Sequence, residues 1–92
     1  PLAVVKSFKT ENEAIELANS SVYGLSAAIW TKNKEKARQL ARQLEVGSVF
    51  VNTVVRSDSR LPIGGIKRSG YGRELSEIGI KEFCAAKTVY VA

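Results

Sequence analysis

A helix-periodic segment held between two short apolar runs is the strongest constraint on the fold. In residues 33–45 apolar side chains recur three and four positions apart, while basic side chains occupy the other side. This spacing predicts an amphipathic helix. The flanking runs, residues 25–31 and 48–52, are short and apolar, as expected of parallel strands covered on both faces. The short links predict a right-handed strand–helix–strand crossover and an α/β fold.

Two further elements are predicted before this unit. Residues 3–8, AVVKSF, are typical of a strand. Thr10 and Glu13 have the spacing of a capping box, in which two side chains accept hydrogen bonds from backbone N–H groups at a helix start. A helix to about Ser20 is expected to follow. Gly47 is predicted to end the second helix in the left-handed conformation. The order therefore predicts a βαβαβ portion of a parallel sheet.

The second half of the sequence is less regular. It predicts a loop over residues 52–72, then a short helix over residues 73–83 that is interrupted or bent near Gly79. Long loops in compact domains are usually functional or disordered, and the apolar run at residues 61–63 argues against disorder. Residues 87–92 alternate like a strand that has no local partner. Such a strand is expected to pair with a sheet edge, for example on another chain.

Composition limits the classes of function. The net charge is +5, from 14 Lys and Arg against 9 Asp and Glu, but the basic residues are spread along the chain. This pattern favours a mixed-charge surface over a polyanion-binding block. The absence of histidine removes the usual base of catalytic triads and a common metal ligand. The single cysteine, Cys84, fits a reducing compartment, and its apolar neighbours predict a small buried hydrophobe. We expect no signal peptide and no membrane span.

The glycine-rich stretch at residues 61–74, LPIGGIKRSGYGRE, suggests nucleotide-binding loops that it does not complete. Gly65 and Gly70 have the spacing of a phosphate-binding loop, but Tyr71 stands where the essential lysine should follow. Gly70 and Gly72 begin a dinucleotide fingerprint, but Leu75 occupies the third glycine position and no strand immediately precedes. Both motifs therefore fail on the residues themselves.

The same stretch leaves one alternative open. Lys67, Arg68 and Arg73 lie around Tyr71 in the sequence. The basic side chains could contact RNA phosphates, and the Tyr71 ring could stack on a base. A single aromatic ring is a small platform. The residues alone thus allow an independent basic module that binds nucleic acid or a protein partner.

The chain resembles a known family over essentially its whole length. The run LPIGGIKRSGYGRELSEIGIKEF, followed by KTV, is similar to the carboxyl-terminal signature of the aldehyde dehydrogenase superfamily, P-F-G-G-x-K-x-S-G-x-G-R-E and then K-T-V. Upstream, AVVKSFKTENEAIELANSSVYGLSAAIWT and GSVFVN resemble the family's strand, helix and N-x-x-x-Y-G-L segment and its G-x-x-x-V-N strand. SDSRLP and SGYGRELSEIGIKEF look most like bacterial and archaeal succinate-semialdehyde dehydrogenases, although lactaldehyde and glyceraldehyde enzymes share much of this pattern.

The resemblance implies oxidation of a small aldehyde, first of all succinate semialdehyde, to its acid with NAD or NADP in the cytoplasm. In the family a cysteine thiolate attacks the carbonyl, hydride passes to nicotinamide, and a glutamate activates water. The family's nucleophile, base and cofactor domain lie upstream of the matching part. The chain is therefore expected to be an inactive carboxyl-terminal fragment with no catalytic, cofactor-binding or metal residue, and Cys84 is not the nucleophile. Pro1 matches the proline of the family's E-x-F-G-P motif.

The resemblance also implies roles for the loop before the glycine pair, which lines the aldehyde tunnel in the family. A substrate carboxylate is expected to accept charge-assisted hydrogen bonds from serine and arginine there. The two arginines could equally be solvent-exposed, with the main carboxylate-binding arginines upstream. Ile63 replaces the usual phenylalanine, which leaves the exact aldehyde open. The predicted substrate-facing residues are Arg56, Ser57, Ser59, Arg60 and Ile63, with Asp58 and Leu61 between them.

A structural turn and an assembly strand complete the expectations. Glycines in the turn allow close approach of the backbone. Ala85 stands where many relatives have glutamate, so an ion pair from that position to Arg73 is not available. Residues 1–86 are predicted to belong to the catalytic domain, and residues 87–92 to form the intersubunit strand of a homodimer or homotetramer. The predicted turn residues are Gly64, Gly65, Ser69, Gly70, Gly72, Arg73 and Glu74.

Overall fold

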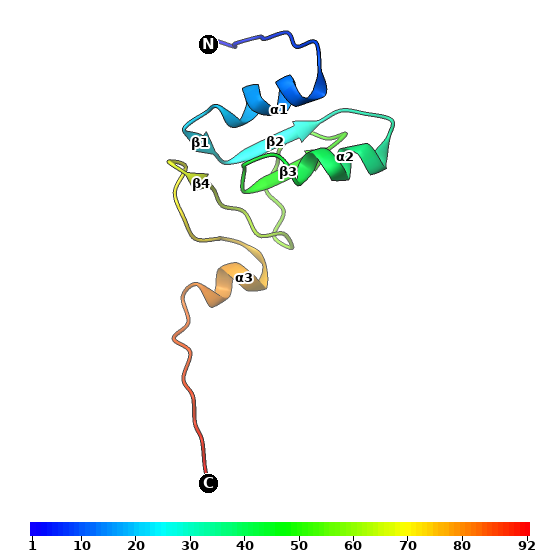
Figure 1. Ribbon diagram of the computed structural model, residues 1–92. Coiled ribbons are helices and arrows are strands. Elements are labelled where there is room, and N and C mark those ends of the chain that lie inside the picture. Colours follow the sequence, from blue (N-terminus) through cyan, green and yellow to red (C-terminus); the bar gives the residue numbers. More distant parts are fainter.

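A computed structural model describes residues 1–92 and shows a small α/β unit with two extended ends (Figure 1). The principal extents of the molecule are 62 × 31 × 24 Å, because the chain after the last helix runs away from the rest. The elements are α1 (Glu11–Asn19), β1 (Tyr23–Gly24), β2 (Ser26–Ile29), α2 (Lys34–Ala41), β3 (Ser48–Val51), β4 (Ile66–Lys67) and α3 (Ser76–Lys81).

The predicted crossover is confirmed. β2 and β3 pair in parallel, from Ser26 opposite Ser48 to Ile29 opposite Val51. Between them, α2 begins at Asn33, whose side chain accepts a hydrogen bond of 3.0 Å from the Lys36 N–H. This cap satisfies a backbone group that has no partner inside the helix. The α/β class follows from this unit.

The helix α2 ends earlier than its apolar periodicity predicts. The side chain of Asn19 accepts a hydrogen bond from the Glu45 N–H and donates one to the Gln43 carbonyl, each at 2.8 Å. These bonds engage backbone groups that a longer helix would need for its own ladder. The helix therefore stops at Ala41, and a turn leads into β3.

The helix α1 begins at the predicted cap. Thr10 Oγ1 accepts a hydrogen bond of 3.2 Å from the Glu13 N–H, as a capping box requires. The Glu13 carboxylate, however, accepts from the Lys9 N–H at 2.8 Å instead of from Thr10. The reciprocal half of the box has thus moved one residue towards the amino terminus.

The predicted strand over residues 3–8 is not formed. This segment has no strand pairing, and Val5 is 93% exposed. A strand needs a neighbouring strand to satisfy its backbone groups, and no strand of the chain pairs with this segment. The parallel sheet therefore has two strands, and a second, antiparallel sheet joins β1 to β4. Residues 87–92 are likewise exposed and unpaired.

The carboxyl-terminal helix differs from its prediction. α3 has six residues and continues through Gly79 without a break. Gly79 is buried against the backbone of Glu74, and a Cβ at Gly79 would lie 2.6 Å from the Glu74 carbonyl carbon. The glycine therefore allows close packing and does not bend the helix. Cys84 is exposed, against the prediction of a buried side chain, since no element covers the end of α3.

Very little of the chain is buried. Four of the 92 residues are buried, and Ala37 is the only hydrophobic side chain among them. The other three are glycines: Gly24, Gly65 and Gly79. Close main-chain contacts, more than an apolar core, therefore fix the region around the glycine-rich stretch. None of the three helices has the length and the apolar character that a membrane-spanning helix requires.

Candidate functional site

Residues 63–74, here called the glycine turn, form a loop that is closed at its base. Ile63 and Glu74 exchange two backbone hydrogen bonds, at 2.9 Å and 2.8 Å. Inside the loop, β4 pairs with β1, with Lys67 opposite Tyr23. The Ser69 hydroxyl accepts a hydrogen bond of 3.0 Å from the Gly24 N–H. The turn is therefore fixed at its base and along one side.

The glycines of the turn lie where backbone segments meet. A Cβ at Gly64 would lie 2.3 Å from the Gly72 carbonyl oxygen, and one at Gly65 would lie 2.5 Å from the Ser69 Cβ. Gly47, which precedes β3, would place a Cβ 1.7 Å from the Gly64 carbonyl oxygen. Gly47 does not adopt the predicted left-handed conformation. It is required because the glycine turn presses against the start of β3.

Arg73 holds the turn from inside. Its Nη1 donates to the Gly65 carbonyl at 3.0 Å and to the Gly72 carbonyl at 2.6 Å, and both bonds are partly buried. No carboxylate pairs with this guanidinium. Main-chain oxygens are thus the partners of Arg73, and Ala85 offers no carboxylate to it.

Residues 56–61, here called the clasp loop, precede the turn and contain an ion pair. Arg60 donates from Nε to Asp58 Oδ1 at 2.9 Å and from Nη2 to Oδ2 at 2.6 Å. The Arg60 N–H also donates to Oδ1, at 3.0 Å. The hydrogen bonds from the Arg60 side chain and N–H hold the pKa of Asp58 well below its ordinary value, and the side-chain hydrogen bond to Asp58 raises the pKa of Arg60. Both groups are therefore charged near neutral pH.

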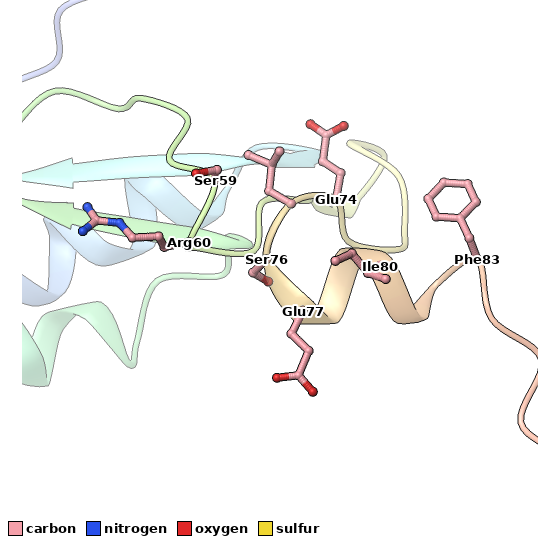
Figure 2. Close-up of a pocket in the computed structure, with 9 residues that line it drawn as sticks. Ser59, Arg60, Glu74, Ser76, Glu77, Ile80 and Phe83 are labelled. Carbon is pink, nitrogen blue, oxygen red and sulfur yellow. The ribbon is translucent and has the colours of Figure 1, made fainter.

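The clasp loop contacts the start of α3 through its backbone. The Ser59 carbonyl accepts a hydrogen bond of 3.0 Å from the Ser76 N–H. An open cavity of about 640 Å³ lies at this junction (Figure 2). Figure 2 shows the Arg60 side chain extending away from Ile80 and Phe83. The lining residues are Ser59, Arg60, Glu74, Leu75, Ser76, Glu77, Gly79, Ile80 and Phe83.

The structure separates the predicted substrate-facing residues. Ser59 and Arg60 line the cavity beside α3, while Ile63 lines a second cavity of about 520 Å³ with the glycine turn. Arg56 and Ser57 are exposed and line neither cavity. Sequence reasoning missed Phe83, which borders both cavities. The available signal was its spacing of three residues from Ile80, which puts both on one side of the helix predicted over residues 73–83.

The basic residues around Tyr71 are largely engaged within the chain. Lys67 Nζ donates to the Asn19 carbonyl at 2.8 Å and forms an ion pair with Glu45 at 2.6 Å. Arg73 is bound to the carbonyls of the turn. Only Arg68 of the three would be available for phosphate. The arrangement therefore does not favour an RNA-binding patch around Tyr71.

At each of the three helix starts, one of the backbone N–H groups that a dinucleotide pyrophosphate would use already has a partner within the chain. A pyrophosphate site needs free backbone N–H groups at a helix start. The side chains of Thr10 and Asn33 each accept a hydrogen bond from one such group, the Glu13 N–H in α1 and the Lys36 N–H in α2. At the start of α3, the Ser76 N–H donates to Ser59.

Fold and sequence together define the class of protein. The profile of the aldehyde dehydrogenase family matches residues 1–89, and the chain belongs to this family. A probable NADP-dependent succinate-semialdehyde dehydrogenase of Synechocystis is 50% identical over 92 residues, which are 100% of this chain and 20% of that protein. The NAD(P)-dependent succinate semialdehyde dehydrogenase Sad of Escherichia coli is 49% identical over 90 residues, or 98% of this chain and 20% of that protein.

Solved structures agree with this assignment. Succinic semialdehyde dehydrogenase from Streptococcus pyogenes, in complex with NADP+, matches with a TM-score of 0.89 and 46% identity over 91% of this chain. Betaine aldehyde dehydrogenase from Staphylococcus aureus, in complex with NAD+, matches with a TM-score of 0.81 and 44% identity over 85% of this chain. The matches cover 18% and 16% of those chains. The chain thus spans about a fifth of its relatives' length.

Proposed function

We propose that this chain is the carboxyl-terminal part of the catalytic domain of an NAD(P)-dependent aldehyde dehydrogenase that oxidises succinate semialdehyde to its acid. The observation that supports this most is the 50% identity, over the whole chain, to a probable succinate-semialdehyde dehydrogenase. The reaction would use groups of the full-length enzyme outside this segment for nucleophilic attack and cofactor binding. This segment would supply part of the wall around the substrate.

Within that wall, the clasp loop is the best candidate to meet the far end of the aldehyde. It contains two arginines and two serines, the types that bind carboxylates through charge-assisted hydrogen bonds. Ile63 would form an aliphatic side of the tunnel, which suits a short chain better than an aromatic ring. The proposed substrate-facing residues are Arg56, Ser57, Ser59, Arg60 and Ile63.

The exposed carboxyl-terminal segment fits an assembled enzyme. Val89 and Val91 are 75% and 84% exposed at the end of the chain, and their backbone has no partner. Residues 87–92 would add to the sheet edge of a second subunit and form a homodimer or homotetramer. We place the assembled enzyme in the cytoplasm, with the exposed thiol of Cys84 kept reduced.

Three aldehydes of different charge test the proposed function in the full-length protein. Succinate semialdehyde carries a carboxylate, butanal is neutral and betaine aldehyde is cationic. With either NAD or NADP, we expect kcat/KM for succinate semialdehyde to exceed that for butanal by about tenfold or more, since charge-assisted hydrogen bonds contribute this much. Betaine aldehyde should be the poorest substrate. Equal values for succinate semialdehyde and butanal would overturn the proposed substrate.

A further inference from the structure

The clasp loop contains a side-chain ion pair in addition to the backbone hydrogen bonds of its turn. The Leu61 N–H already donates to the Asp58 carbonyl at 3.0 Å, which closes a tight turn through main-chain atoms. The Asp58 carboxylate accepts two further hydrogen bonds from the Arg60 guanidinium. These bonds fix the direction of a long side chain that would otherwise move freely. Their effect is on the orientation of Arg60.

The geometry of the pair leaves one edge of the guanidinium free. A guanidinium has five N–H groups in a planar fork, and two of its edges can each bind a carboxylate. Asp58 occupies the edge formed by Nε and Nη2. Nη1 donates no hydrogen bond within the chain, and the Arg60 side chain is 84% exposed. The edge formed by Nη1 and Nη2 is therefore available to a second carboxylate.

Asp58 itself is less accessible than its partner. Its side chain is 20% exposed. An incoming anion would thus meet the guanidinium first, on the side of the loop away from Ile80 and Phe83 (Figure 2). Pairing with Asp58 lowers the net positive charge around Arg60. It also fixes the Arg60 rotamer in advance, so that less side-chain entropy is lost when an anion binds. The pair therefore holds the guanidinium in one orientation before any anion arrives.

We infer that Asp58 is a positioning residue, which orients Arg60 so that its free edge binds the carboxylate of the aldehyde substrate. This inference rests on the proposed function. Asp58 does not contact the substrate, and its effect passes through Arg60. The chemical class recognised is a short aldehyde with a carboxylate at the end opposite its carbonyl.

Four forms of the full-length enzyme test this role: wild type, Asp58→Ala, Arg60→Ala and the double variant. KM and kcat are measured for succinate semialdehyde and for butanal. In Asp58→Ala we expect KM for succinate semialdehyde to rise about fivefold, with kcat and both butanal constants unchanged, because orientation of one charged hydrogen-bond donor is lost. In Arg60→Ala the KM should rise most, since the remaining Asp58 carboxylate repels the substrate. The double variant should recover part of this loss.

The outcomes separate the inference from the proposed function. A wild-type enzyme that does not prefer succinate semialdehyde to butanal overturns the proposed function and the inference with it. A wild-type preference that Asp58→Ala leaves unchanged overturns the inference alone. Equal losses for both aldehydes would show a purely structural role and also overturn it. The matched control is Glu35→Ala with Arg38→Ala, an exposed ion pair on α2, which should leave both substrates unaffected.

Discussion

The glycine turn and the clasp loop are neighbours in sequence, but they are held in different ways. In the glycine turn, main-chain atoms approach so closely that side chains are excluded at Gly64 and Gly65. In the clasp loop, two charged side chains hold each other at the surface, through Asp58 and Arg60. A side chain added at Gly64 or Gly65 would clash with neighbouring atoms, whereas the Arg60 side chain lies mostly in solvent and can be replaced without a clash. The turn should therefore determine stability, and the loop should determine which ligand is selected.

The largest expected effect lies where the turn meets the crossover. Gly47→Ala would place a Cβ 1.7 Å from the Gly64 carbonyl oxygen. This oxygen belongs to the backbone, so it cannot move aside without moving the glycine turn. We expect the full-length protein to lose about 3 kcal/mol or more of stability, the upper range for overpacking. Soluble yield and the thermal midpoint would measure this loss.

Gly70→Ala is the matched control for this change. Gly70 has a φ of 101° but nothing lies within 4 Å of a Cβ there. Its cost should be the conformational term alone, about 1–2 kcal/mol. If Gly47→Ala were no worse than Gly70→Ala, close packing of the turn on β3 would not be what stabilises this region.

A smaller loss is expected from Arg73→Ala. This change leaves the carbonyls of Gly65 and Gly72 without their partly buried donor. Loss of a charged donor to such groups costs about 2–3 kcal/mol. Arg73→Lys should restore part of the stability, because an ammonium can reach one carbonyl. A thermal midpoint that falls equally in both variants would contradict the role of Nη1 as a donor within the turn.

The contrast between the regions also explains what the sequence could predict. Periodicity identified the crossover from β2 to β3, since apolar spacing and short links depend on local residues alone. The capping role of Thr10 was predicted for the same reason. The role of Gly47 was not, because its requirement comes from Gly64, which is distant in sequence and close in space. Local patterns cannot reveal such a contact.

The site shows the same difference between what sequence patterns predict and what depends on the three-dimensional structure. The resemblance of residues 61–83 to a family signature located the glycine turn and the loop before it. It did not reveal that Asp58 and Arg60 bond to each other, which depends on a two-residue turn that becomes visible only in three dimensions. The predicted strand at residues 3–8 failed because a strand depends on a neighbour that no local pattern specifies.

Asn52, which follows β3 and begins the chain towards the clasp loop, should show an intermediate effect. Its side chain accepts from the Thr31 N–H and donates to the Thr31 carbonyl, both at 2.8 Å, and its φ is 56°. Asn52→Gly keeps this backbone conformation and removes both bonds. We expect a loss of about 1–2 kcal/mol. Asn52→Ala should cost more, because alanine adds backbone strain, and the reverse order of thermal midpoints would contradict this account.

The smallest expected effect is that of pH on the clasp. The pKa of Asp58 is held well below its ordinary value by hydrogen bonds from Arg60. A carboxylate with a lowered pKa contributes its interaction above the ordinary value, and loses it only as the pH falls through the lowered one. The KM ratio of Asp58→Ala to wild type for succinate semialdehyde should therefore be constant between about pH 6 and about pH 8. A ratio that falls towards one at about pH 6 would mean that Asp58 is already protonated there, which would contradict the lowered pKa.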